Sequence, residues 1–157
     1  DALYKASKAG VKIRLNVRGI CCLKPGTRKE AKNIYVVSVI DYYLEHARLF
    51  QFHQGGDELL FLSSADWMTR NLEKRVELMV PVVDTSTKLQ LIDILEAAFK
   101  DNQHAHVIQA DGSSKRIEQH GKPAFRMQEY LQKKAVNASK AKTYQHTTTF
   151  EPHTPSS

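Results

Sequence analysis

The chain has little cysteine, and its cysteines do not form a pattern typical of a disulfide or a zinc finger. The only two, Cys21 and Cys22, are adjacent, and neighbouring residues rarely bridge one another. No further cysteine or histidine stands at zinc-site spacing from them. We therefore predict no metal site built by the protein itself, and we interpret both cysteines as buried packing residues of a reduced, cytosolic protein.

Long apolar runs are also missing. No stretch approaches about 20 apolar residues, the length that a membrane-crossing helix needs, and no signal-peptide pattern opens the chain. We predict no transmembrane segment. The length of 157 residues, with 41% hydrophobic and 25% charged residues, suits one globular domain. The formal net charge of +6 favours an anionic partner, such as nucleic acid, acidic lipid or phosphate chains, without choosing among them.

The first part of the chain has the pattern of paired strands. Residues 11–17 alternate apolar with basic or polar side chains, which predicts a strand with one apolar and one basic face. Residues 34–40 form a β-branched run, typical of a more buried strand. Apolar runs at 49–52 and 59–62 flank a Gly-Gly pair, which predicts a β-hairpin.

The remaining segments mix helices with short strands, so the predicted fold class is α/β, a mixed β-sheet flanked by helices. The expected helices lie at 2–7, after the N-cap Asp84 and at 123–138; the expected strands lie at 76–83, 106–110 and 116–118; and a polar loop is expected at 63–72. We expect one domain at 1–140 and a disordered tail at 141–157, which is rich in Thr, His, Pro and Ser. Because the chain opens inside a helix, we expect that it was cut from a longer protein.

The densest cluster of unusual residues runs over 43–77. His46 and Arg48 are two apart, so on an extended segment both side chains point to one face. Ser64 and Asp66 follow directly on the next strand of the expected hairpin. These polar groups are expected to converge with the imidazole and the guanidinium at one strand end.

This cluster resembles one half of a phospholipase D-type site, which uses His-x-Lys, a later Asp, and then Gly-Ser-x-Asn. His46 matches the histidine, and Arg48 stands where the lysine would be. His53 occupies the aspartate position, and residues 63–66 replace the Gly-Ser-x-Asn string. Loss of the lysine and the aspartate argues against ordinary phosphodiester hydrolysis, whereas the histidine, arginine and serine preserve a pocket for phosphate.

Three strings carry a closer match, to the last, phospholipase D-like domain of family-one polyphosphate kinases. They are Arg-Gly-Ile-Cys-Cys-Leu from Arg18, Leu-Glu-His-Ala-Arg from Leu44, and Ser-Ser-Ala-Asp-Trp-Met-Thr-Arg-Asn-Leu from Ser63. The resemblance covers residues 3–116 in the same order and at comparable spacing. It implies a phosphotransferase that moves the terminal phosphate of ATP reversibly onto polyphosphate, through a phosphohistidine upstream of this chain.

The resemblance also implies roles for individual residues. Arg18 and His46 match positions that contact ATP phosphates, so we expect the two side chains to meet and hold the same anionic oxygens. His46 is in addition a candidate catalytic residue, as an accessory acid or base or as a secondary phosphohistidine, with Glu77 expected to orient its ring. Trp67 is interpreted as a packing anchor. Further candidates for ATP or phosphate contacts are Arg48, Ser64, Asp66 and Arg70.

The same resemblance implies a set of partners. They are ATP or ADP with Mg²⁺, whose ligands are expected outside this chain, inorganic polyphosphate, and the upstream domains of the same enzyme. The full-length enzyme is expected to self-associate and to be cytoplasmic, with membrane association left open. DNA binding is not expected, and the fragment alone is expected to be inactive.

Two other functions stay open at this point. His46 and the serine loop are compatible with a phospholipase D-like phosphodiesterase that acts as a dimer of two half-sites. The positive charge is compatible with a basic nucleic-acid-binding module, although the sequence has no recognised helix-turn-helix and no interleaved aromatic and basic face.

Overall fold

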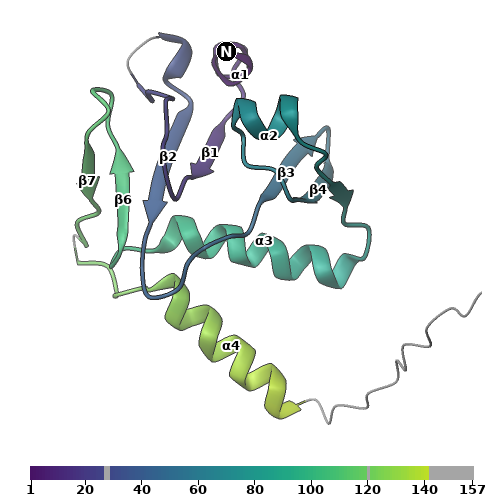
Figure 1. Ribbon diagram of the computed structural model, residues 1–157. Coiled ribbons are helices and arrows are strands. Elements are labelled where there is room, and N and C mark those ends of the chain that lie inside the picture. Colours follow the sequence, from purple (N-terminus) through teal and green to yellow (C-terminus); the bar gives the residue numbers. More distant parts are fainter. Residues whose placement is uncertain (27–28, 120, 142–157) are drawn as a thin grey trace, which may run out of the picture.

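The computed structural model describes residues 1–26, 29–119 and 121–141, and these form two β-sheets with helices around them (Figure 1). In chain order the elements are α1 (Ala2–Lys8), β1 (Ile13–Asn16), the short 3₁₀ helix η1 (Lys29–Ala31), β2 (Ile34–Val39), β3 (Leu49–Gln54), β4 (Asp57–Ser63), α2 (Thr69–Lys74), β5 (Met79–Pro81), α3 (Thr85–Lys100), β6 (Ala105–Ile108), β7 (Ser114–Arg116) and α4 (Met127–Ala141).

The first sheet has the strand order β1-β2-β6-β7 and is mixed. β1 pairs in parallel with β2, with Ile13 opposite Ile34, whereas β2–β6 and β6–β7 are antiparallel. β2 is a central strand, and its Val36 and Val37 are completely buried. A β-branched run suits this position because it packs well on both faces of a pleated sheet.

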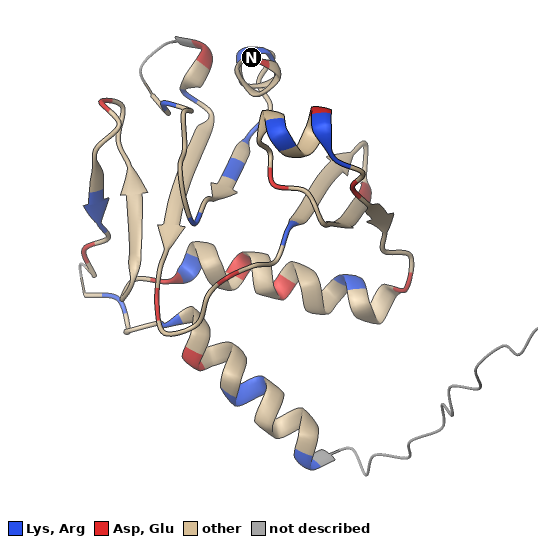
Figure 2. Ribbon diagram, viewed as in Figure 1, with Lys and Arg blue, Asp and Glu red and all other residues tan. Residues whose placement is uncertain are grey.

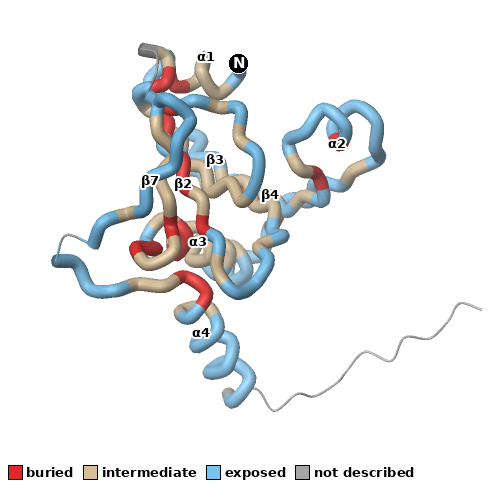
Figure 3. Tube along the Cα trace, turned by 60° about the vertical axis from the view of Figure 1, so that its left-hand side comes forward, coloured by how far each residue is buried: buried red, intermediate tan, exposed pale blue. Residues whose placement is uncertain are grey.

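The second sheet has the order β3-β4-β5 and is antiparallel throughout. Gly55 and Gly56 join β3 to β4 with φ values of 60° and 107°. Residues that carry a side chain rarely adopt a positive φ, so the two-residue hairpin turn depends on this pair of glycines. β5 lies at the sheet edge and is exposed along its length, whereas the buried residues gather around β2 and the meeting point of α3 and α4 (Figure 3).

α3 runs below both sheets and links them (Figure 1). It begins at the N-cap Asp84, whose carboxylate accepts hydrogen bonds from the Thr87 backbone N–H at 2.7 Å and from the Ser86 hydroxyl. These bonds satisfy an N–H group that has no partner within the helix. Near its other end, Ala97 and Ala98 pack in a buried cluster with β2, β6 and the start of α4.

The buried carboxylate of Asp101 ties the loop after α3 to α4. It accepts hydrogen bonds from the backbone N–H groups of His104 at 2.7 Å and Ala105 at 3.2 Å. Its second oxygen accepts from the backbone N–H of Met127 at 2.8 Å, at the start of α4. One side chain therefore fixes where β6 and α4 leave the loop.

The α/β prediction, a mixed sheet flanked by helices, is confirmed. Three local predictions are wrong: the loop expected at 63–72 contains the start of α2, the strand expected at 76–83 is only Met79–Pro81, and the last helix begins at Met127 and not near 123. Cys22 is exposed, so only Cys21 fits the packing interpretation. The tail expected from 141 lies, after Ala141, outside the described residues.

The described helices include none with both the length and the apolar character needed to cross a membrane.

Candidate functional site

A cavity of about 350 Å³ opens between the two sheets, above α3. Its walls come from β1 and the residues after it, from the segment that leads into β3, from the loop after β4, and from α3. Figure 2 shows basic segments on β1 and at the entry to β3, on the two sides of this space. The lining residues are 14–20, 45–50, 65–68, Ile94, Leu95, Ala98, Phe99 and Met127.

The β1 wall follows from the alternation in the sequence. Ile13, Leu15 and Val17 pack on one face, in the cluster formed with α1 and β2. The alternate residues Arg14 and Asn16 therefore face the cavity, and Arg18 continues their row after the strand ends.

Arg14 and Asn16 of this row already have partners within the protein. Arg14 forms a two-pronged ion pair with Glu96 of α3, with Nη1 3.1 Å from Oε2, and its guanidinium lies 4.6 Å from the centre of the Phe99 ring. The side-chain oxygen of Asn16 accepts a hydrogen bond from the backbone N–H of Val39 at 3.3 Å. Both side chains thus connect β1 to its neighbours.

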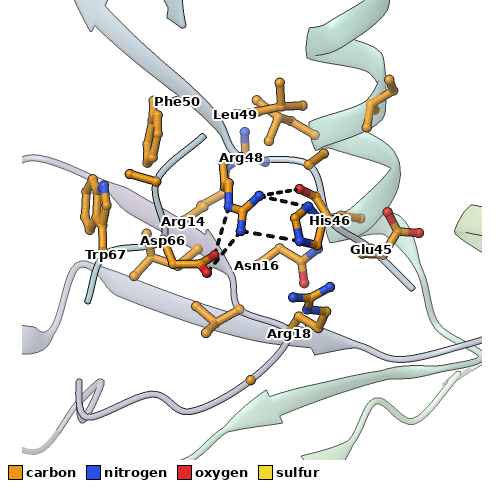
Figure 4. A pocket seen from close by; sticks show the side chains of 18 of the residues that line it. Arg14, Asn16, Arg18, Glu45, His46, Arg48, Leu49, Phe50, Asp66 and Trp67 are labelled. Carbon is orange, nitrogen blue, oxygen red and sulfur yellow. Dashed lines mark hydrogen bonds and ion pairs between the residues drawn. The ribbon is translucent and has the colours of Figure 1, made fainter. Parts of the chain in front are cut away.

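Arg18 differs from the other two. Its Nη1 is buried and has no hydrogen-bond partner among the described residues. Arg18 and His46 line the same cavity, and Figure 4 draws both side chains there together with Asn16. A buried donor without a partner costs about 1–3 kcal/mol, and more when it is charged, so this nitrogen is suited to bind an anion that enters the cavity.

On the opposite wall, Asp66, Arg48 and His46 form a chain of contacts (Figure 4). Arg48 donates from Nε to Asp66 Oδ1 at 2.9 Å and from Nη2 to Oδ2 at 3.0 Å. Its Nη1 lies 2.8 Å from Nδ1 of His46 and 3.3 Å from the His46 carbonyl oxygen. The carboxylate therefore holds the guanidinium, and the guanidinium holds the imidazole.

The electrostatics of the cavity follow from these pairs. The pKa of the Asp66 carboxyl lies below its ordinary value, chiefly because Arg48 donates hydrogen bonds to it, against partial burial and with help from the charges of Arg48 and Arg18. Glu45 also lines the cavity, but its carboxylate accepts a hydrogen bond from Gln128 of α4. Arg14 and Arg48 are paired with carboxylates, whereas Arg18 forms no ion pair with the described residues.

The six site residues predicted from the sequence fall into two groups, those that line the cavity and those that do not. Arg18, His46, Arg48 and Asp66 line the cavity. The remaining two do not line it: Ser64 and Arg70.

The contacts of the loop at residues 63–66 explain why Ser64 does not line the cavity. The hydroxyl of Ser64 donates to Glu77 and accepts from the backbone N–H of Leu78 at 2.9 Å, which ties the loop to the approach to β5. Glu77 also lies 3.9 Å from Arg75 and is not bonded to His46. The prediction that Glu77 orients the ring is therefore wrong, because Arg48 contacts that ring.

Aromatic side chains form another part of the wall. Trp67 stacks on Phe50, with ring centres 5.2 Å apart and planes 8° from parallel. This stack fits the interpretation of Trp67 as an anchor for its loop, yet the indole also lines the cavity and is 55% exposed. Arg14, Asn16 and Phe50 also belong to the wall and were not predicted from the sequence, although the period-two alternation puts Arg14 and Asn16 on the face of β1 that continues to Arg18.

Among the residues described by the structure, no group of three or more His, Cys, Asp or Glu side chains is placed to hold a metal ion.

The chain is similar to known proteins. Residues 1–128 match the family model described as Polyphosphate kinase C-terminal domain 2. A polyphosphate kinase of Rhodopirellula baltica is 51% identical over 99% of this chain, and one of Halalkalibacterium halodurans is 55% identical over 66% of it. The chain covers 18% and 15% of these two relatives.

A solved structure is similar as well. The crystal structure of polyphosphate kinase from Porphyromonas gingivalis superposes with a TM-score of 0.84 at 41% sequence identity. The match covers 89% of this chain and 22% of that one. The chain thus spans less than a quarter of the proteins that it resembles here.

Proposed function

Since the chain belongs to the polyphosphate kinase C-terminal domain 2 family, we propose that it binds ATP and polyphosphate for such an enzyme. The whole enzyme transfers the terminal phosphate of ATP reversibly to polyphosphate, through a phosphohistidine that lies upstream of this chain. The upstream domains and further copies of the enzyme are its proposed protein partners. This chain alone supplies one wall of the active site and is inactive by itself.

This proposal rests on Nη1 of Arg18, which is buried and has no hydrogen-bond partner in the part of the chain that the structure describes. A guanidinium keeps its charge at all working pH values and can grip two oxygens of one phosphate with its planar fork. Arg18 lies after a strand end and just before Gly19, where backbone can approach a ligand closely. An anionic oxygen in the cavity would give the free donor its partner.

The chemistry of phosphoryl transfer matches what the cavity offers. Such reactions depend on in-line positioning and on neutralising the charge of the phosphate oxygens, with little covalent work by the surrounding protein. Arg18 supplies positive charge, and His46 supplies a ring nitrogen on the facing wall. The described residues offer no carboxylate cluster for a metal, so Mg²⁺ is proposed to enter bound to the nucleotide and to ligands outside this chain.

Ligand titration tests the proposal. The only tryptophan of the chain, Trp67, lines the cavity, so its fluorescence reports on occupancy. Titration with Mg-ATP, ADP and tripolyphosphate should give saturable changes for all three. Arg18→Ala should weaken binding of each by about 30-fold, which is about 2 kcal/mol. The control Arg75→Ala removes one equally charged side chain that does not line the cavity, and it should leave affinity unchanged.

The division of labour within the enzyme needs a second experiment. Incubation of this chain with ATP labelled at the γ-phosphate should give little or no stable phosphoenzyme and no polyphosphate. Efficient self-phosphorylation or chain synthesis by this chain alone would contradict the proposal.

Two further assays separate the other functions that the sequence leaves open. Cleavage of bis(p-nitrophenyl) phosphate that disappears in His46→Ala would replace the proposal with a phosphodiesterase. Stronger competition by duplex DNA than by tripolyphosphate would replace the proposal with a nucleic-acid-binding module. Both ligands are compared at one fixed salt concentration, because the binding of each depends steeply on salt.

A further inference from the structure

The guanidinium of Arg48 is fixed in one orientation. Asp66 accepts two hydrogen bonds from it, from Nε and from Nη2, at 2.9 and 3.0 Å. This paired geometry holds the plane of the fork as well as its position. The side chain of Arg48 is 18% exposed, and its remaining nitrogen, Nη1, is directed at His46 (Figure 4).

The contact between Arg48 and His46 allows only one direction of hydrogen bonding. A guanidinium has no acceptor atom and does not lose its proton in proteins, so Nη1 must donate. Nδ1 of His46, 2.8 Å away, must therefore be an acceptor without a hydrogen. The second contact, from Nη2 to Nε2 at 3.5 Å, is at the outer limit for a hydrogen bond, so the shorter contact determines the tautomer.

A neutral imidazole carries one hydrogen. With Nδ1 as the acceptor, that hydrogen is on Nε2. Histidines that act as nucleophiles or metal ligands usually have a carboxylate or a carbonyl on the second nitrogen, which takes the hydrogen and leaves a lone pair on the first. His46 has a cation in that place, which reverses the arrangement.

The carboxylates near the ring do not restore the usual arrangement. Glu45 accepts a hydrogen bond from Gln128. Glu77 accepts from Ser64, and Asp66 is occupied by Arg48. In the described part of the chain, none of these three is bonded to a His46 nitrogen.

From this arrangement we propose that Asp66 and Arg48 are positioning residues that hold His46 neutral, with its hydrogen on Nε2, as a hydrogen-bond donor to a phosphate oxygen. The inference rests on the proposed function of the cavity and decides between roles that the sequence leaves open. Nε2 has no lone pair to accept a phosphoryl group. Full transfer of its hydrogen would leave an imidazolate, so His46 is neither a secondary phosphohistidine nor a general acid. A neutral histidine can still stabilise charge by donating a hydrogen bond.

Nitrogen NMR of the ligand-free chain tests this inference directly. The chain has seven histidines, so ¹⁵N-histidine labelling gives few signals, and the set missing from His46→Gln identifies the residue. At pH 7.5, Nδ1 of His46 should have the shift of a bare acceptor nitrogen and Nε2 that of a protonated one. A protonated Nδ1, or averaged shifts from two tautomers, would overturn the proposal.

Variants of the two positioning residues supply a second readout. Asp66→Asn cannot accept two charge-assisted bonds, so Arg48 loosens and the two nitrogen shifts of His46 should move toward each other. Arg48→Lys keeps the charge without the fork and should act in the same direction. The control Arg75→Ala should leave the His46 signals in place. Unchanged His46 shifts in both site variants, with backbone spectra that show a folded domain, would also overturn the proposal.

Binding then separates this inference from the proposed function. Asp66→Asn should weaken tripolyphosphate binding by about 10-fold, as expected for a group that orients a ligand-binding side chain. If the wild-type chain binds neither ATP nor tripolyphosphate while His46 shows the expected tautomer, the proposed function fails and the arrangement of the three side chains stands. If the chain binds both ligands but His46 is protonated at Nδ1, only the inference on His46 fails.

Discussion

Two arginines in different regions of the molecule are used in opposite ways. Arg126, just before α4, donates to both oxygens of Asp41, from Nε at 2.7 Å and from Nη2 at 2.5 Å, and lies 4.3 Å from the centre of the Tyr42 ring. The Asp41 side chain is only 2% exposed. In the cavity, Arg18 has a buried nitrogen without a partner among the described residues.

We interpret the first contact as one that maintains the fold, and we propose that the second arginine binds a ligand. An arginine with satisfied donors joins the segment after β2 to the start of α4. An arginine with a bare buried donor destabilises the empty domain, and such a residue is expected where binding compensates for it. The two should therefore respond differently to mutation.

The largest effect is expected from Asp41→Ala. It leaves Arg126, whose side chain is partly exposed, without its carboxylate, and removing one partner of an ion pair with a buried member is strongly destabilising. The free energy of unfolding in urea should fall by about 3 kcal/mol. Affinity for tripolyphosphate, measured on the folded protein, should stay within about twofold of the wild type. A loss of affinity without a loss of stability would contradict the interpretation that the pair of Asp41 and Arg126 maintains the fold.

The next effect is expected from Arg18→Ala, with the opposite pattern. Affinity for tripolyphosphate should fall by about 30-fold, while the free energy of unfolding of the empty domain stays the same or rises. Removing a buried donor that lacks a partner relieves a cost, which explains the direction. Isothermal titration and urea denaturation of the same sample measure both quantities. A drop in stability as large as that of Asp41→Ala would show that Arg18 is structural.

A smaller effect is expected when pH is varied. The pKa of Asp41 is lowered, chiefly by the hydrogen bonds from Arg126. A carboxyl with a lowered folded-state pKa stabilises the domain above its unfolded value, about 3.9, and this contribution is lost as pH falls through the lower folded value. Urea unfolding between about pH 6 and pH 2 should therefore show a steeper acid loss in the wild type than in Asp41→Asn. Parallel curves would contradict the assignment.

The smallest effect is expected at the start of α3. The Thr87 hydroxyl and backbone N–H and the Ser86 hydroxyl all donate to Asp84, which lowers its pKa to about 2. Asp84→Ala removes the helix cap, so the urea midpoint should fall slightly at pH 7, with Asp84→Asn closer to the wild type. Tripolyphosphate affinity should not change, because Asp84 is outside the cavity.

The sequence allowed the parts of the fold with strong local patterns to be predicted. Alternation over 11–17 predicted the strand with two different faces, Gly55-Gly56 predicted the hairpin, and Asp84 predicted the start of α3. α2 was missed because its N-cap position, Met68, makes no side-chain cap. β5 was overextended because an apolar run at an exposed sheet edge has the same composition as a buried strand.

The candidate site was also predicted only in part. Arg18, His46, Arg48 and Asp66 were found through short strings, and the structure brings them to one cavity. The hydrogen-bond partner of each carboxylate could not be predicted from the sequence, because it depends on how the loop after β4 folds back. That fold turns Ser64 and Glu77 toward each other and leaves Asp66 to Arg48.

The central claim is that Arg18 and His46 bind the same anion, and a double-mutant cycle on tripolyphosphate binding tests it most directly. Dissociation constants are measured for the wild-type chain, Arg18→Ala, His46→Ala and the double variant. If both side chains hold one phosphate group, the double variant should bind more tightly than additivity predicts, with a coupling energy of about 1 kcal/mol. Additive losses, or no loss in either single variant, would contradict the account.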